Sequence, residues 1–256
     1  MDFSTDPGAS PRRALCRTIE GDFETHMTVR ADHRPDTVVS LRDWAVVHGL
    51  AFTATVLDRG RTPSRPTLTL YGTGSLEEQL RAAEQCAARL AEAGFTVVRT
   101  KIEAAPWNEG VPQTDAEAAT FPAHCHFEHR LKLRLPIPYD TKRLAAVAER
   151  HSAHVSRTAR HILPGGVQER YVTQLARGVG RPVARARVDA LLDGLIAAGY
   201  RPVDLREEFV LHDDNPTVDN GWTEESVQRP EDRQDEAKPD GSRSDGARSD
   251  GSQPDK

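Results

Sequence analysis

Cysteines, aromatic residues and long apolar runs are scarce in this chain. Three cysteines occur among 256 residues, and none belongs to a CxxC pair. An odd and sparse set argues against a disulfide framework and for a reducing compartment. No stretch approaches the roughly 18 apolar residues of a membrane helix, and residues 1–16 lack the apolar core of a secretory signal. We therefore expect a cytoplasmic protein that does not associate with a membrane.

The charge is also too weakly one-sided to point to nucleic acid. The net charge is −5, and aromatic residues make up 5% of the chain. Nucleic-acid binding favours a basic surface, and RNA-binding sheets need stacked aromatics, for which Tyr71 and Tyr171 are the candidates. Neither GxGxxG nor GxxxxGK[ST] occurs. These absences argue against nucleic acid as the partner and predict no cofactor.

Both ends of the chain are poor in apolar residues. The segment 223–256 is rich in charge and repeats RSDG at 243–246 and 248–251. Such a composition cannot bury enough apolar surface to offset the entropy of ordering the chain. We expect disorder over residues 1–20 and 223–256, and the C-terminal part acts either as a charged interaction tail or only as a solubilising segment.

Two similar strands, FETHMTVR (23–30) and FEHRLKLR (127–134), indicate a repeated unit. After the first strand, apolar spacing changes from strand-like to helix-like and back twice. Ser75 is a candidate N-cap, and Gly94 a candidate helix stop. We expect the first unit to contain a strand at 23–31, a helix at 37–49, strands at 50–57 and 67–72, a helix at 75–94 and a strand at 95–104.

The second half repeats this order. Asp140 is again a candidate N-cap, and Gly199 matches Gly94 as a helix stop. We expect a strand at 126–136, a helix at 140–152, strands at 153–163 and 168–177, a helix at 181–200 and a strand at 201–213.

The β-α-β-β-α-β order is that of the split βαβ, or ferredoxin-like, unit. The sequence therefore predicts an α+β fold built by tandem duplication of this unit. The first unit is expected at 21–105 and the second at 126–222, with a linker at 106–125. The alternative is that two similar strands occur by chance in a single mixed sheet.

Alternation along the first strand assigns its side chains to two faces. Phe23 and Met27 are expected to face the helices, which leaves Glu24, His26 and Thr28 on the open face of the sheet. A histidine beside a glutamate can exchange a proton near neutral pH. Glu24, His26 and Thr28 are therefore the candidate catalytic residues.

Acidic, basic and hydroxyl side chains line the open faces of the other strands. Guanidinium, ammonium and hydroxyl groups suit phosphate or carboxylate oxygens. If the two open faces lie opposite each other, the cleft between them would hold a small phosphate-bearing or otherwise anionic substrate. The candidate substrate-binding residues are Lys101, Glu103, Glu128, Arg130, Lys132, Ser156, Arg160, Thr173, Arg206 and Glu208.

The triplet His26-Met27-Thr28 resembles the HxT strand motif of the 2H phosphoesterases. In that family, two related α+β halves each contribute such a motif, and the two histidines act as acid and base on a cyclic phosphate or 2′,5′-type phosphodiester. The matching positions of the second half hold Arg130 and Lys132. The resemblance implies a phosphoesterase-like hydrolase or transferase. The alternative is a non-catalytic ligand sensor or accessory protein of the same fold.

The wider pattern FETH…KIEA…HFEH…ERYVTQ…GW also resembles a family of uncharacterised duplicated ferredoxin-like proteins. That resemblance implies the fold and no particular activity.

The segment HCHFEH (124–129) offers a different kind of site. His124, His126 and Glu128 share one face of a strand, and zinc accepts such ligands. A second ligand pair at structural-zinc spacing is absent from the sequence, so no metal site is assigned and metal at His124 and His126 stays an open alternative. Cys125 could act as a nucleophile only beside a base or a cation, which the sequence does not reveal.

Overall fold

The computed structural model shows part of the chain, within the compact unit Met1–Glu225. The segments expected to be disordered, 1–20 and 223–256, lie outside it apart from Cys16 and residues 18–20. The described residues are 16, 18–31, 35–56, 64–163 and 166–219, without the side chains at 35, 55, 56, 64, 156–163 and 219.

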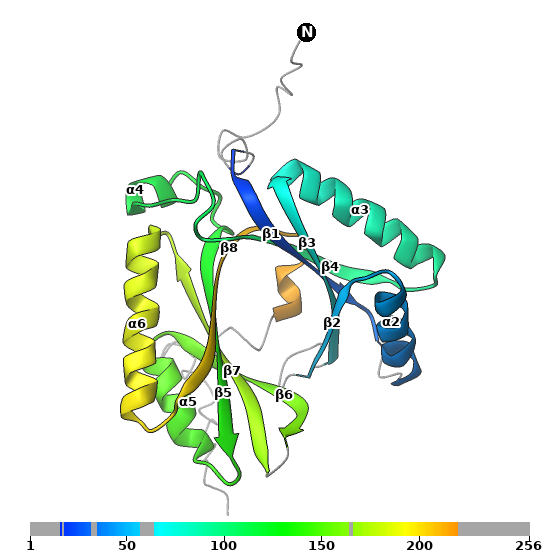
Figure 1. Cartoon of the computed structure of the whole chain (residues 1–256). Coiled ribbons are helices and arrows are strands. Elements are labelled where there is room, and N and C mark those ends of the chain that lie inside the picture. The colour runs from blue at the N-terminus through cyan, green and yellow to red at the C-terminus, as the bar shows by residue number, and fades with distance from the viewer. Residues whose placement is uncertain (1–15, 17, 32–34, 57–63, 164–165, 220–256) are drawn as a thin grey trace, which may run out of the picture. The chain divides into compact units, whose positions relative to one another are not determined.

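The first half contains the expected six elements in the expected order (Figure 1). The strand β3 is longer than expected because it pairs with β1 over Thr67 to Ser75 and with β2 over Ser64 to Thr69. The elements are β1 (Glu20–Val29), α2 (Pro35–Val47), β2 (Ala51–Val56), β3 (Ser64–Ser75), α3 (Leu76–Glu92) and β4 (Val97–Ala104).

The second half has the same order of elements. Two short helices were not expected: α4 (Asp115–Ala118) in the segment between the halves, and the 3-10 helix η1 (Pro216–Asp219) after the last strand. The remaining elements are β5 (His126–Pro136), α5 (Thr141–Arg150), β6 (Ala153–Leu163), β7 (Val167–Arg177), α6 (Arg181–Ala197) and β8 (Pro202–Asp213).

Both predicted N-caps are confirmed. The Ser75 hydroxyl accepts a hydrogen bond from the Glu78 backbone, and the Glu78 carboxylate accepts one from the Ser75 backbone, which forms a capping box on α3. The Asp140 carboxylate caps α5 through the Arg143 backbone N–H. These contacts satisfy N–H groups that the first turn of a helix leaves without partners.

The eight strands form one sheet in the order β2-β3-β1-β4-β8-β5-β7-β6, with antiparallel pairing throughout. The protein is therefore an α+β protein. The halves meet where β4 pairs with β8, from Lys101 opposite Asp213 to Ala104 opposite Phe209.

This junction corrects the expectation of two sheets that face each other across a cleft. Because β4 and β8 pair edge to edge, the helix-free faces of the two halves form one continuous surface. The sheet curves, so that its end strands β2 and β6 approach each other, while the helices lie on the outer side (Figure 1). The polar residues of both halves therefore share the inner face.

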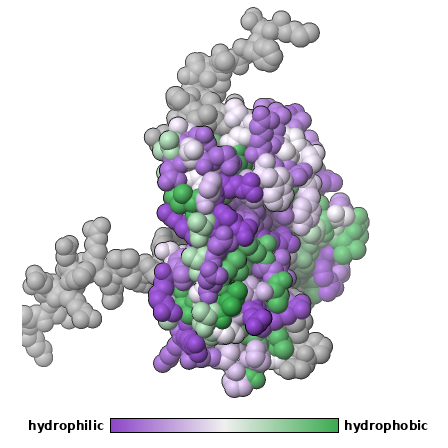
Figure 2. All heavy atoms as spheres, turned by 60° about the vertical axis from the view of Figure 1, so that its left-hand side comes forward, coloured by the Kyte–Doolittle hydropathy of each residue, from purple (hydrophilic) through white to green (hydrophobic). Residues whose placement is uncertain are grey.

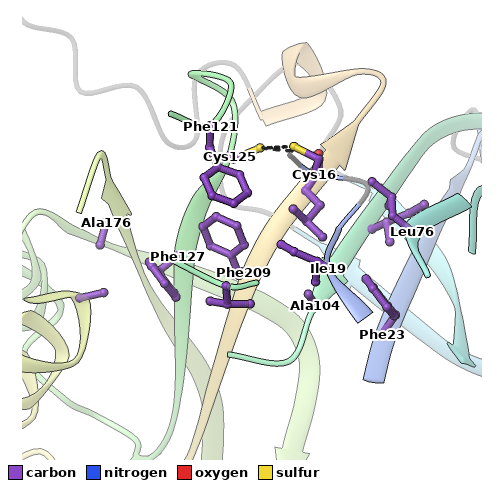
Figure 3. Packing of buried hydrophobic residues seen from close by; sticks show 14 of the residues in the cluster. Cys16, Ile19, Phe23, Leu76, Ala104, Phe121, Cys125, Phe127, Ala176 and Phe209 are labelled. Atoms are coloured by element: carbon purple, nitrogen blue, oxygen red, sulfur yellow. Dashed lines mark hydrogen bonds between the residues drawn. The ribbon is translucent and has the colours of Figure 1, made fainter. Parts of the chain in front are cut away.

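Apolar side chains fill three clusters between the sheet and the helices. The middle cluster spans the junction of the halves, where Phe209 of β8 packs 4.7 Å from Phe127 and 5.5 Å from Phe121 between ring centroids (Figure 3). Phe23 and Met27 are buried on this side of β1, as the alternation predicted. The first strand therefore presents its polar residues to the inner face.

Large apolar residues are also found on the surface. Figure 2 turns the α6 side of Figure 1 forward and shows apolar groups among more numerous polar ones. On α6 the exposed examples are Val183 and Ile196. Single exposed apolar residues are normal for folded proteins. Of the helices in the described ranges, none has the length and apolar character to span a membrane.

Candidate functional site

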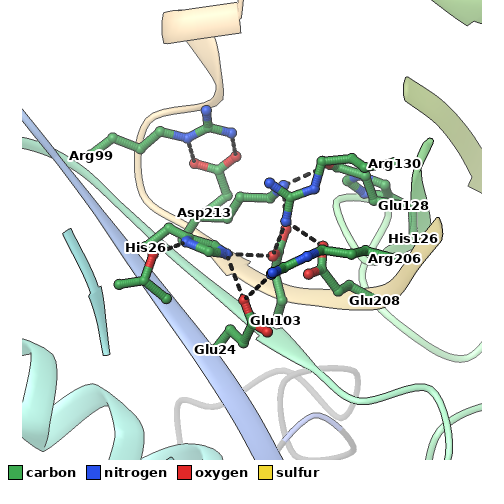
Figure 4. Close-up of polar contacts among 12 residues, drawn as sticks. Glu24, His26, Arg99, Glu103, His126, Glu128, Arg130, Arg206, Glu208 and Asp213 are labelled. Carbon is green, nitrogen blue, oxygen red and sulfur yellow. Dashed lines mark hydrogen bonds and ion pairs between the residues drawn. The ribbon is translucent and has the colours of Figure 1, made fainter. Parts of the chain in front are cut away.

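A network of charged side chains occupies the inner face where the two halves meet (Figure 4). Its centre is Glu103 of β4, whose side chain is 0% exposed. Glu103 Oε2 lies 2.8 Å from His26 Nε2 and 3.0 Å from Arg130 Nη2, and Oε1 lies 2.5 Å from Lys101 Nζ. One carboxylate thus contacts a histidine of the first half and an arginine of the second.

The closest carboxylate to His26 differs from the one expected. His26 Nε2 lies 2.8 Å from Glu103 but 3.6 Å from Glu24, and His26 Nδ1 lies 2.9 Å from the Thr69 hydroxyl. The reason is the strand register: Glu24 is directly opposite Glu103, and His26 is opposite Lys101. Two carboxylates facing each other across a strand pair repel, and the imidazole lies beside both.

The second half supplies Arg130 and Glu128 from β5 and Glu208 from β8. The Arg130 guanidinium donates to Glu208 as well as to Glu103, and its Nε lies 3.7 Å from Glu128 Oε1. Lys101 Nζ lies 2.6 Å from Glu128 Oε2. The network therefore links β1, β4, β5 and β8 through ion pairs.

These contacts shift several pKa values in opposite directions. Burial opposes the charge of Glu103, but Lys101 and then Arg130 outweigh it and hold the pKa of Glu103 well below its usual range. Burial likewise opposes the charge of Glu128, but the charge of Lys101 outweighs it, so the pKa of Glu128 is also lowered. Burial disfavours the Lys101 ammonium too, yet Glu103 and Glu128 raise its pKa. The three groups therefore stay ionised at neutral pH.

Glu208 behaves differently from the other buried carboxyls. Burial first, and then the charge of Glu103, raise the pKa of Glu208 to about 8, although Arg130 acts against them. A carboxyl with this pKa carries a proton at neutral pH and can give it up near pH 8. Such a group beside a pocket is a candidate acid or base.

A pocket of about 610 Å³ opens beside the network, where β4 ends and β8 continues without it. Four residues connect the pocket to the network, because they line the pocket and also take part in the contacts of the network. They are Glu24, Glu103, Arg206 and Glu208. The lining residues are Asp22, Phe23, Glu24, Tyr71, Gly72, Thr73, Glu103, Ala104, Ala105, Trp107, Leu205, Arg206, Glu207 and Glu208.

The remaining candidate residues lie at different distances from this centre. Lys132 lies over the Tyr171 ring, 5.6 Å from its centroid, rather than beside His26. Thr28 is buried and sits opposite Arg99, two residues beyond His26, and Thr173 is buried opposite Arg130. Ser156 and Arg160 belong to β6, but their side chains are outside the described part of the protein.

The histidines of HCHFEH do not gather into one cluster. His126 Nδ1 lies 3.2 Å from Arg177 Nη1 and 2.7 Å from the His124 carbonyl, and His124 Nε2 lies 3.2 Å from the Leu211 carbonyl. His129 is buried on the helix side, and its Nδ1 lies 3.3 Å from Gln174.

Two other groups of ligand atoms come within 4.8 Å of one another among the described residues. They are Glu24 with His26 and Glu208, and Glu103 with Glu128 and Glu208. Arg206 and Arg130 already contact these carboxylates, so a metal ion there would compete with a guanidinium.

The cysteines are free thiols and buried. Cys16 and Cys125 lie in the middle core cluster with their Sγ atoms 3.6 Å apart (Figure 3). The hydrogen bond to Cys16 and then burial raise the pKa of Cys125. The thiolate that nucleophilic attack requires is therefore disfavoured at Cys125.

Several site residues were missed from the sequence. Thr69 orients His26 from β3, and Tyr71 and Trp107 line the pocket with exposed rings. Arg99 of β4 donates two hydrogen bonds to Asp213 of β8, at 2.9 and 2.6 Å, beside the network. No local sequence pattern marks Trp107 as a pocket residue, because its position depends on where β4 ends.

The comparisons with known proteins do not place the chain in a family. No family model matches it, and no curated protein matches it. Among solved structures, it is similar to the acetolactate synthase small subunit of Thermotoga maritima, at 13% identity over 75% of this chain and 95% of that one, with a TM-score of 0.29. A protein described as a chlorite dismutase has 14% identity over 78% and 97%, with a TM-score of 0.26. Scores this low carry no argument about this chain.

Proposed function

We propose that this chain binds a small ligand in the pocket at the end of β4 and exchanges a proton with it through Glu208, with His26 and Glu24 as neighbouring acid–base groups. The observation that carries the proposal is a buried carboxyl that lines a pocket and has a pKa of about 8. General acids and bases work best when their pKa lies near the working pH. The adjoining network, held by ion pairs from both halves, keeps this carboxyl in position.

We also propose that the two halves of the protein arose by tandem duplication of a ferredoxin-like unit. Support comes from the same β-α-β-β-α-β order in both halves and from equivalent strand orders, β4-β1-β3-β2 and β8-β5-β7-β6. The matched glycines also share a conformation, with φ of 83° at Gly94 and 88° at Gly199 after equivalent helices.

A phosphate-bearing ligand, with hydrolysis or transfer, stays a second candidate. Arg206 favours it, because its side chain is 50% exposed at the pocket and its Nη1 is 3.4 Å from Glu24 Oε2. Lys101 and Arg130 support it less, since carboxylates already contact both. The resemblance to 2H phosphoesterases gains no support from the site, where Arg130 stands in place of a second histidine.

The test is a titration that follows the indole resonance of Trp107 by NMR while small amines, carboxylates and phosphate esters are added. Binding in the pocket shifts that resonance, and no shift with any compound would contradict the proposal. Turnover of bis(p-nitrophenyl) phosphate separates enzyme from sensor. In an enzyme, His26→Ala should slow turnover by roughly 100- to 10,000-fold while binding remains. Binding without turnover favours a ligand sensor.

A further inference from the structure

We infer that the ligand of this pocket is an organic cation with an apolar body, such as a quaternary or protonated amine. The inference rests on the proposed function, because it specifies the ligand class of the same pocket. It does not follow from the sequence, in which basic residues of the inner face pointed to an anion.

The first argument is the charge of the lining. Its acidic residues come from three strands, whereas Arg206 is the single basic residue among the lining residues that the structure describes. An anion would meet more acidic than basic groups in a partly enclosed space, where charges interact more strongly than in water, and the excess of negative charge grows as Glu208 loses its proton. A cation would be attracted instead. The acidic lining residues are Asp22, Glu24, Glu103 and Glu208, together with Glu207, whose carboxylate contacts Arg185 on the helix side and does not add to the charge of the pocket.

The second argument is that the nearby cations already have partners. Arg130 contacts Glu103 and Glu208, and Lys101 contacts Glu103 and Glu128. An anionic ligand would have to displace a carboxylate that the strands hold fixed. Releasing either cation would leave a buried carboxylate without its partner, which is costly.

The third argument is the pair of exposed rings at the pocket. Trp107 is 65% exposed and Tyr71 is 64% exposed, and both line the pocket beside carboxylates. Tryptophan and tyrosine faces attract cations, and aromatic cages recognise quaternary ammonium groups in this way. Rings with nearby carboxylates provide both an apolar wall and a counter-charge.

The fourth argument comes from Glu208 itself. Its side chain is only 7% exposed, yet it lines the pocket. Arg130 donates to its Oε2. A cation in the pocket would lie beside the ionised carboxylate of Glu208 and be attracted to its charge.

Cation binding should therefore release a proton from Glu208. A positive charge beside the carboxyl favours its ionised form, so the step is Glu208–COOH plus cation giving the Glu208 carboxylate–cation pair and one proton in solution. Affinity should rise with pH until Glu208 is ionised in the free protein. The charged and titratable groups around Glu208 are Glu24 and His26 of β1, Glu103 of β4, Glu128 and Arg130 of β5, and Arg206 of β8.

The experiment compares three probes that share a benzene ring: benzyltrimethylammonium, benzyl alcohol and phenyl phosphate. Dissociation constants are measured on the full chain by the Trp107 indole resonance, at about pH 6 and about pH 8, on the two sides of neutrality. We expect benzyltrimethylammonium to bind most tightly, and its affinity to rise roughly tenfold or more between the two pH values. Tighter binding of phenyl phosphate overturns the inference but leaves the proposed pocket intact.

Variants sharpen the comparison. Glu208→Gln should remove the pH dependence of benzyltrimethylammonium binding. Arg206→Gln should strengthen benzyltrimethylammonium binding, because it frees Glu24, and should weaken the binding of phenyl phosphate. Glu149→Gln, an exposed position on α5, is the matched control and should change neither. If Arg206→Gln weakens the cation, or if the pH dependence persists in Glu208→Gln, the inference is wrong. If none of the probes shifts Trp107, the proposed function fails together with it.

Discussion

Replacing Lys101 by methionine tests whether the charged network stabilises the fold. Lys101 Nζ lies 2.5 Å from Glu103 Oε1 and 2.6 Å from Glu128 Oε2, and its side chain is 10% exposed. Methionine keeps most of the aliphatic stem but removes the charge. Lys101→Met therefore leaves two buried carboxylates with less compensation while it changes the packing little.

The expected loss follows from two opposing contributions. At an effective dielectric constant of about 20, each contact of Lys101 is worth roughly 6 kcal/mol of attraction. Desolvation of the ions offsets several kcal/mol of this per ion. Removing one partner of a buried pair typically costs about 3–5 kcal/mol. We expect a loss in this range, because Arg130 still compensates part of the charge on Glu103.

The loss should also depend on pH. In the wild type, the pKa values of Glu103 and Glu128 are lowered, so their contribution to stability is present above the pKa of the unfolded chain and declines as pH falls. Without Lys101 this contribution is smaller at neutral pH. The difference between wild type and variant should therefore shrink toward about pH 4.

Urea unfolding followed by circular dichroism measures both effects. Arg42→Gln is the control, because the Arg42–Asp43 pair is exposed and should contribute less than about 1 kcal/mol. A loss in Lys101→Met no larger than in the control would refute the reasoning, and so would a loss that is the same at both pH values.

Four further substitutions, one of them a control, probe other parts of the structure. In the wild type, the free energy of unfolding should decline by roughly 1.4 kcal/mol per pH unit above about pH 4.5, because the raised pKa of Glu208 lets the folded state keep a proton that the unfolded chain has lost. Glu208→Gln should remove this decline. Urea midpoints of both proteins at about pH 5 and pH 7 would show the difference, and the same pH dependence in both would contradict the prediction. Gly180→Ala should cost about 1–3 kcal/mol of stability, since its Cβ would lie 2.5 Å from the Gln113 backbone. Gly194→Ala should be neutral or stabilising, because its Cβ meets only the movable imidazole of His151. Equal shifts of the melting temperature in the two variants would contradict this prediction. Phe209→Ala should lower the free energy of unfolding in urea by about 3–5 kcal/mol, because its ring packs in the middle core cluster. A loss below about 1 kcal/mol would contradict this and show that the cluster collapses around the gap.

The order of helices and strands could be predicted because each element has its own local pattern. Alternation placed Phe23 and Met27 in the core and His26 on the polar face, and Ser75 and Asp140 marked helix starts by their side chains. These signals lie within a few residues of the feature that they specify.

Relations between distant strands could not be predicted in the same way. Nothing in residues 97–104 indicates that this strand pairs with β8, so the two inner faces were expected to oppose each other rather than to join. Glu24 was chosen as the partner of His26 because it is near in sequence, whereas Glu103 is nearer in space through the β1–β4 register. The pocket with Trp107 depends on the point at which β4 ends, which alternation does not reveal.

The placement of β8 between β4 and β5 has a consequence for folding during synthesis. The ribosome releases β1 to β4 well before β8, so the unpaired edge of β4 must wait while the whole second half emerges. An open edge of this kind can pair with another chain and aggregate. Arg99, Lys101 and Glu103 place charges along the inner face of this waiting strand, and inward-pointing charges are a known protection for strand edges. The same charged side chains would thus disfavour aggregation of the unfinished sheet during synthesis, before they form the ion pairs of the folded protein.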